Sequence, residues 1–200
     1  MSSVALTKFN TMLLGGKILQ SQAGSPSTAT TDQVLIDQTF YKAAVALGVG
    51  CWEGYIEAAL REFVAKVRLQ AHRRNWTMIS IFEAMVDAKA SNLNTPNWEQ
   101  SRALLIEVTG MDPYASWSWA PKFTNQNDTK QYFDGIMKVR HAFAHGFAVP
   151  NDVPGVTAPG ILDDNYVTDA LSCLEFFAIT TEGLLEYELL HRHTCVSGWN

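Results

Sequence analysis

Apolar residues recur at intervals of three and four along almost the whole chain, and this spacing constrains the fold more than any other feature. The longest such run extends from Thr31 or Asp32 towards His72, whereas alternating apolar and polar stretches are scarce. We therefore predict an all-α fold, an up-and-down helical bundle around one long central helix. The Gly48-Val-Gly50 segment within that helix predicts a bend or a close crossing by another helix.

Shorter runs predict further helices, each bounded by capping residues, prolines or glycines. We expect Thr95 to cap one helix, with Pro96 in its first turn. Asp128 and Gln131 predict a capping box for another helix, which Gly146 should end. Besides the long helix, the expected helices span residues 4–20, 77–90, 96–109, 128–146 and 165–191, with loops over 21–28, 111–127 and 149–164.

The size and composition fit one domain. A chain of 200 residues with 47% hydrophobic and 18% charged residues can bury a core without a disulfide or a structural metal. We expect a single domain over residues 1–200, with its core at about 33–191 and with 1–32 as an N-terminal helix and flexible loop. Cys51, Cys173 and Cys195 form no Cys-x-x-Cys pair, which argues against a disulfide framework or a zinc cluster.

No apolar run predicts a transmembrane helix and no signal-peptide pattern is evident, so we expect a cytoplasmic protein without a membrane partner. The net charge of −5 argues against general electrostatic coating of nucleic acid, and any RNA contact must be local. Trp117 and Trp119 lie in an expected loop, and we name both as candidate substrate contacts that stack on RNA bases. Such a loop can also pack as a flap or serve a protein interface.

One segment concentrates groups that can do chemistry, Arg140-His141-Ala-Phe-Ala-His145-Gly146. The two histidines are four residues apart and share a helix face, and Arg140 adjoins them near the helix end. Cleavage of RNA by the ribose 2′-hydroxyl needs a base, an acid and a cation, which two histidines and an arginine supply without a metal or cofactor. We therefore predict Arg140, His141 and His145 as catalytic residues, with Lys138 as a substrate contact.

Arg140-x4-His145-Gly at the end of an amphipathic helix, together with Trp52-Glu-Gly-Tyr-Ile-Glu57 on the long helix, resembles the HEPN superfamily and within it the RiboL-PSP-HEPN domains. The resemblance implies a homodimeric helical bundle with a metal-independent endoribonuclease site where two motif copies meet. It also implies that His141 fills the polar position after the arginine and that Glu53 supports Arg140. A toxin or antiviral-defence effector would then act on RNA under control of an antitoxin or defence-system partner.

Two other interpretations stay open. His141-x3-His145 has the spacing of two metal ligands on one helix face, with Asp134, or His191 and His193, as further ligands. Alternatively, the chain is a non-catalytic helical interaction or regulatory module of a defence or toxin–antitoxin system.

Overall fold

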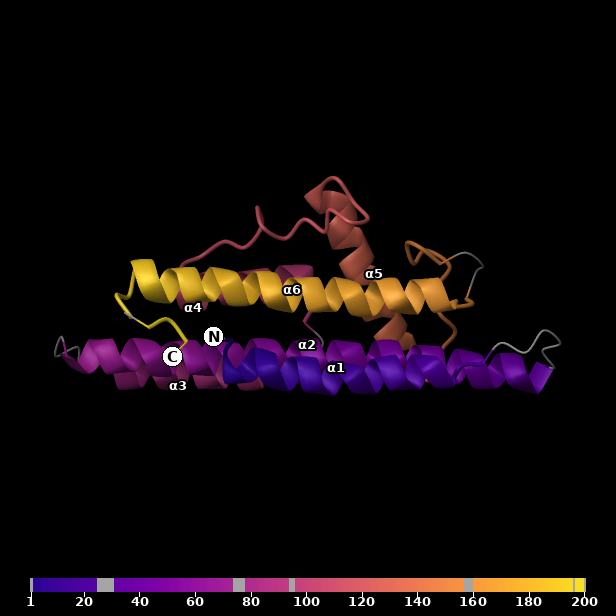
Figure 1. Cartoon of the computed structure of the whole chain (residues 1–200), viewed down its shortest axis with the longest axis horizontal. Coiled ribbons are helices and arrows are strands. Elements are labelled where there is room, and N and C mark those ends of the chain that lie inside the picture. The colour runs from indigo at the N-terminus through magenta and orange to yellow at the C-terminus, as the bar shows by residue number, and fades with distance from the viewer. Residues whose placement is uncertain are drawn as a thin grey trace.

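The computed structural model describes residues 2–24, 31–73, 78–93, 96–156, 160–195 and 197–199. Within these ranges the secondary-structure elements are helices, which confirms the predicted all-α class. Three of them, α1, α2 and α6, lie along the long axis of the molecule, and α5 crosses them steeply (Figure 1). The helices are α1 (Val4–Gln22), α2 (Thr31–Arg73), α3 (Ile79–Ser91), α4 (Trp98–Thr109), α5 (Gln126–Ala144) and α6 (Asp164–His191).

The central helix of the bundle is α2, as predicted. It has 43 residues, is roughly 65 Å long at 1.5 Å per residue, and contacts each of the other helices. Its large buried side chains contribute roughly 1.5–3 kcal/mol each to the free energy of folding. Those with at most 2% exposure include Trp52, Tyr55, Ile56, Leu60 and Phe63.

By length and composition, the Asp32–Leu69 part of α2 would also suffice to span a membrane, and 33% of its most apolar window is buried in the bundle. The core helix of a soluble bundle meets the same criterion. The absence of a membrane partner therefore stays a prediction.

Helix α6 crosses α2 closely at Gly48. A Cβ atom at Gly48 would lie 2.8 Å from Cδ2 of Leu171 and 3.0 Å from Cδ1 of Leu174. Helix α2 is assigned without interruption through this point. A side chain at Gly48 would therefore force Leu171 or Leu174 to move, which fits the close crossing that the sequence predicted as one of two outcomes. A Cβ atom at Gly50 would meet no atom of the other described elements within 4 Å.

The first helix is tied to the bundle by a buried carboxylate. Ser3 caps α1, because its Oγ accepts a hydrogen bond from the Leu6 N–H. The Ser3 N–H and Oγ–H donate to Glu182 on α6 at 2.5 and 2.8 Å, and the Tyr55 hydroxyl donates to the same carboxylate at 3.2 Å. Phe9 of α1 lies in the shared apolar core. The core therefore begins in α1, earlier than the predicted residue 33.

The start of α4 differs from the prediction. Asn97 is the cap: its Oδ1 accepts from the Gln100 N–H at 2.9 Å, and the Asn97 N–H donates to Gln100 Oε1 at 3.2 Å. Thr95 lies outside the described residues, and Pro96 precedes the helix instead of occupying its first turn. The Thr-Pro pair is a common start signal, but Asn97 and Gln100 have the three-residue spacing that closes a capping box.

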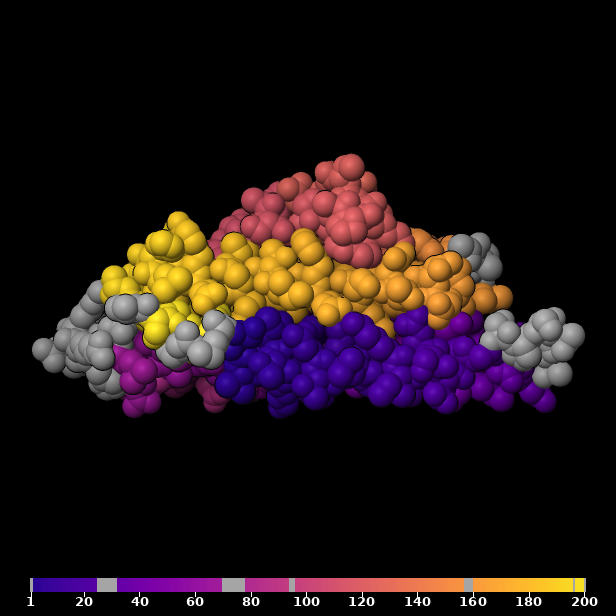
Figure 2. Space-filling view, viewed as in Figure 1, coloured from indigo at the N-terminus to yellow at the C-terminus, as the bar shows by residue number. Residues whose placement is uncertain are grey.

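The loop between α4 and α5 projects from the surface of the molecule above α6 (Figure 2). Its two tryptophans point into the core, Trp117 with 0% exposure and Trp119 with 4%. The indole N–H of Trp117 donates to Thr181 Oγ1 at 3.1 Å, and its ring centroid lies 5.1 Å from that of Phe177. The predicted role of these tryptophans in substrate binding is therefore wrong, because burial leaves neither ring free to stack on a base.

Helix α6 runs parallel to α2. Near their first residues the Gln38 amide donates to the Leu162 carbonyl, and near their last residues the Cys195 thiol donates to the Lys66 carbonyl. Figure 2 shows α1 and α6 side by side along the face of the molecule. The segment that follows α5 lines the candidate site described next with Phe147, Ala148 and Pro150.

Candidate active site

Helix α5 carries the predicted catalytic residues, and its inner face holds it in the core. Tyr132, Phe133, Ile136 and Val139 are 0% exposed, as their spacing predicts. Phe143 was expected to continue this face but is 38% exposed. The buried face passes through Ala142 in the last turn, so the phenyl ring of Phe143 is left at the surface.

The first turn of α5 is capped one turn earlier than predicted. Asn125 is the cap, since its Oδ1 accepts from the Asp128 N–H at 2.9 Å. Asp128 therefore lies inside the helix, and the predicted capping box of Asp128 with Gln131 is wrong. Asparagine at this position satisfies the same free N–H group that an aspartate would.

The last turn of α5 has a hydrogen-bonding pattern that fixes the backbone of the motif. The Phe147 N–H donates to the Ala142 carbonyl at 2.8 Å, and the Gly146 N–H donates to the Phe143 carbonyl at 3.2 Å. Gly146 has φ of 69°, the left-handed conformation that favours glycine at a helix end. The predicted role of Gly146 is confirmed, and the reversal of the chain places Phe147 beside the helix.

His141 and His145 lie next to each other on the surface. Their ring centroids are 4.4 Å apart with an interplanar angle of 52°, and both residues are exposed. The ring of Phe147, 63% exposed, is stacked 5.9 Å from that of His145. Two imidazoles and an aromatic ring therefore form an exposed cluster at the carboxyl end of α5.

The guanidinium of Arg140 has no partner within the described residues. Every other arginine whose side chain the structure describes pairs with a carboxylate: Arg61, Arg68, Arg102 and Arg192. Arg140 itself is half-buried, so its planar fork is available to an anion from outside the chain. The spacing along the sequence predicts that Arg140 lies near the two histidines. The structure places Arg140 and His141 in the last two turns of α5 and His145 directly after the helix, as its C-cap.

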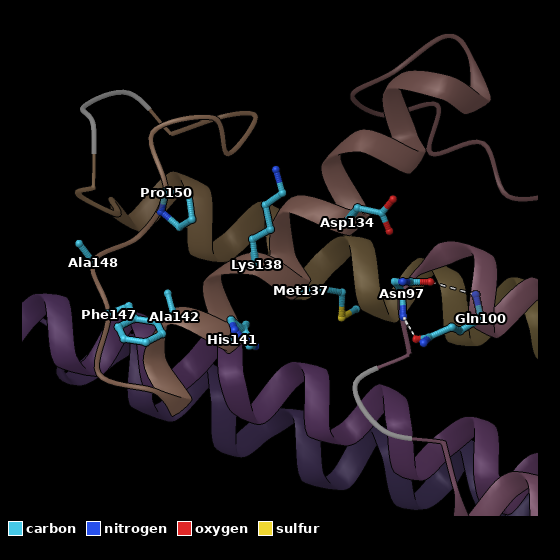
Figure 3. A pocket seen from close by; sticks show the side chains of 10 residues that line it. All are labelled: Asn97, Gln100, Asp134, Met137, Lys138, His141, Ala142, Phe147, Ala148 and Pro150. Atoms are coloured by element: carbon cyan, nitrogen blue, oxygen red, sulfur yellow. Dashed lines mark hydrogen bonds between the residues drawn. The ribbon is translucent and has the colours of Figure 1, made fainter.

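Lys138 lines a surface pocket of about 560 Å³ between α4 and α5. Its ammonium is paired with Asp152 at 2.5 Å, and both side chains are largely exposed. An exposed ion pair contributes little to stability and exchanges readily for a phosphate. Figure 3 shows Asp134, Lys138 and His141 projecting from α5 in this pocket, with Asn97 and Gln100 at the end where Asp134 lies and Phe147 at the other end.

Asp134 is the most desolvated charged group of the pocket. Its Oδ1 accepts a hydrogen bond from the Trp98 N–H at 3.0 Å, at the first residue of α4. Burial raises the pKa of the Asp134 carboxyl above its ordinary value, although the Trp98 N–H and Lys130 act in the opposite direction. Within the described residues, Oδ2 accepts no hydrogen bond, so this atom is open to a donor in the pocket.

The predicted support of Arg140 by Glu53 is not found within the described residues. Glu53 is half-buried on α2, and neither its carboxylate nor the guanidinium of Arg140 forms an ion pair there with the other or with a third group. This prediction comes only from the resemblance to the HEPN superfamily, because Glu53 and Arg140 lie on different helices and no spacing in the sequence relates them.

A metal site receives no support from the neighbours of the two histidines. Among the residues that the structure describes, no group of three or more His, Cys, Asp or Glu side chains is arranged to hold a metal ion. His191 instead packs on Tyr187 and His193 on Phe63. Neither completes the pair formed by His141 and His145.

Sequence reasoning missed the pocket itself. Asp134, Lys138 and His141 are spaced by four and three residues, which puts them on one stripe of α5, and this signal was available. The sequence does not show that Asn97, Gln100 and Phe147 also line the pocket. Their positions depend on how α4 and the loop after α5 pack against α5.

No family model, no curated protein and no solved structure matches this chain.

Proposed function

We propose that this chain is a metal-independent endoribonuclease of the HEPN type, a toxin or antiviral-defence effector whose site is completed by a second copy. The observation that carries the proposal is the contact between the two exposed imidazoles, together with the guanidinium of Arg140, one residue before His141, which has no partner within the described residues. That set contains the groups needed for attack on a phosphodiester by the neighbouring 2′-hydroxyl.

The reaction needs two proton transfers. One imidazole takes the proton of the 2′-hydroxyl as its oxygen bonds to phosphorus, and a protonated imidazole gives a proton to the 5′ oxygen as the phosphorus–oxygen bond breaks. The products are a 2′,3′-cyclic phosphate and a 5′-hydroxyl. Arg140 neutralises the charge that develops on the phosphoryl oxygens, and its fork suits two of them at once.

Exposed aromatic rings around the motif favour a second copy as the partner. Phe143 and Phe147 are 38% and 63% exposed on either side of His145. Aromatic side chains are enriched in protein interfaces, and a two-fold contact would place both motif copies face to face. The proposed dimer therefore buries these rings and brings two guanidiniums and four imidazoles together.

The experiment is cleavage of a structured RNA in excess chelator by the wild type, His145→Ala and His191→Ala. His191 is a matched control, because it is also an exposed histidine at a helix end but packs on Tyr187 at another place. We expect His145→Ala to lose about 10²- to 10⁴-fold in rate and His191→Ala to keep the wild-type rate. Equal rates for all three proteins would refute the site.

The second candidate is the non-catalytic interaction module, and the exposed rings of Phe143 and Phe147 favour it as well. In that case an antitoxin, immunity or regulatory protein covers the same cluster. Wild-type protein that forms a complex through these rings but leaves RNA intact would support this candidate over the nuclease.

A further inference from the structure

The pocket between α4 and α5 adjoins the motif and has features of a base-recognition site. Its polar groups are Asn97, the cap of α4, Gln100 on α4 and Asp134 on α5. Met137, Ala142 and Phe147 supply apolar surface. Base-reading pockets combine a few directed polar groups with apolar or aromatic walls. The volume of about 560 Å³ is ample for a purine.

Several donors and acceptors in this pocket have no hydrogen-bond partner within the described residues. Asn97 and Gln100 use their amide oxygens in the capping box of α4, which leaves both NH2 groups without an acceptor in the described residues. Asp134 Oδ1 accepts the Trp98 N–H and has a second lone pair left, and Oδ2 accepts no hydrogen bond from the described residues, so both oxygens can accept from a ligand. The pocket therefore presents amide donors beside a carboxylate acceptor.

That pattern discriminates among the four RNA bases. A carboxylate accepts best from two neighbouring N–H groups, and guanine alone presents such a pair, N1–H and N2–H, with the O6 acceptor next to it. Uracil offers one ring N–H between two acceptors, and adenine and cytosine offer one exocyclic amine beside an acceptor. Met137 gives apolar surface beside Asn97 and Asp134, whereas Phe147 lies next to His145 at the opposite end of the pocket (Figure 3).

The position of the pocket along α5 links it to the motif. Asp134, Lys138 and His141 lie on one helix stripe, and His145 follows one turn later. His141 is roughly 10 Å along the axis from Asp134, a distance comparable to the length of a nucleoside. A base held at Asp134 would thus place its own ribose beside the imidazoles.

We propose that the α4–α5 pocket binds a guanine base through Asp134 and the amides of Asn97 and Gln100, and so directs cleavage to the phosphodiester next to a guanosine. The inference rests on the proposed ribonuclease function for its consequence, but the binding of the base is measured without cleavage.

The test uses free nucleosides, which carry no phosphate for Arg140 to bind. Guanosine, inosine and adenosine are titrated into the full chain by calorimetry or by NMR. Inosine is the matched probe, because it differs from guanosine only in lacking the N2 amine. We expect guanosine to bind about tenfold or more tightly than either of the others, as bidentate base contacts require.

Two substitutions change the donors and acceptors of the pocket but keep the hydrogen bonds at the first turn of α4. Asp134→Asn keeps an oxygen for the Trp98 N–H, and Gln100→Glu keeps the acceptor that closes the capping box. Each should weaken guanosine binding about tenfold or more with an unchanged circular dichroism spectrum. Asp163→Asn, at the cap of α6 outside the pocket, should bind as the wild type does.

The outcomes separate the two proposals. Guanosine binding that is undetectable, that equals inosine binding, or that survives in Asp134→Asn would overturn the pocket assignment, whatever the protein does to RNA. Guanosine preference in a wild-type protein that leaves RNA intact would uphold the pocket and refute the nuclease, and the same preference should persist in Arg140→Ala.

Discussion

The imidazole rings of His141 and His145 lie with their centroids 4.4 Å apart on an exposed helix end. Contact between the rings follows from their spacing of four residues, and the left-handed conformation of Gly146 turns the chain away directly after them. Two imidazoles are therefore held together where a substrate can reach them.

Because the two histidines share one site, their contributions to cleavage should not multiply. His141→Ala and His145→Ala should each lower the rate about 10²- to 10⁴-fold, and the double variant should be no slower than the slower single variant by more than a small factor. Single-turnover rates in chelator measure this. Losses that multiply in the double variant would mean that the rings act independently.

Gly48 and Gly54 on α2 form a matched pair for stability. A methyl group at Gly48 would press on Leu171 and Leu174, whereas one at Gly54 would meet nothing within 4 Å. Gly54→Ala should raise the free energy of unfolding by about 0.5–1 kcal/mol through helix propensity. Gly48→Ala should lower it by up to about 2 kcal/mol, because overpacking outweighs the same gain.

Urea unfolding of the two alanine variants provides the measurement. A Gly48→Ala protein as stable as Gly54→Ala would show that the crossing of α2 and α6 has room for a side chain.

Much of this fold follows from the spacing of apolar residues, and the errors have local causes. The sequence predicts the extent of α2 and the buried face of α5 up to Val139, because many apolar residues contribute to each pattern. Helix starts were misassigned at Asp128 and Thr95 since several adjacent residues can each cap a helix. A single capping side chain decides where such a helix begins, and the spacing of apolar residues does not show which residue is the cap.

The candidate site shows the same division. The proximity of Arg140, His141 and His145 follows from positions on one helix, and spacing alone predicts it. The burial of Trp117 does not, because it depends on a loop folding back onto α6, where Thr181 accepts the indole N–H. Contacts between elements distant in sequence decide which aromatic rings reach the surface.

Glu182 should make stability depend on pH. Burial raises the pKa of its carboxyl in the folded state, despite hydrogen bonds from Ser3 and Tyr55 that lower it. The stabilising contribution of a raised carboxyl pKa is present in full below the unfolded value of about 4.3 and is lost as pH rises through the folded value. The wild type should therefore lose stability relative to Glu182→Gln as pH rises from about 4 through the folded pKa.

Denaturant unfolding of both proteins at several pH values in that range tests this sign. A difference that instead grows in favour of the wild type as pH rises would show that the hydrogen bonds to Glu182 outweigh its burial.

Trp117 should matter for stability and not for contact with RNA. Trp117→Phe removes the hydrogen bond to Thr181 and part of a buried ring, and should lower the free energy of unfolding by about 1–3 kcal/mol. At a temperature where the variant stays folded, its affinity for RNA should equal that of the wild type. A large loss of affinity without a loss of stability would instead support a base-stacking role for this ring.

Arg140 is proposed to hold a phosphodiester while the histidines transfer the protons of the reaction. The most direct measurement is the end chemistry and rate of RNA cleavage in chelator by the wild type, Arg140→Ala and Arg102→Ala, the last being an arginine already paired with Asp112. We predict fragments ending in 2′,3′-cyclic phosphate from the wild type and Arg102→Ala, and a loss of about 10²-fold or more in Arg140→Ala. Cleavage that Arg140→Ala retains in full, or products ending in 3′-hydroxyl, would contradict the account.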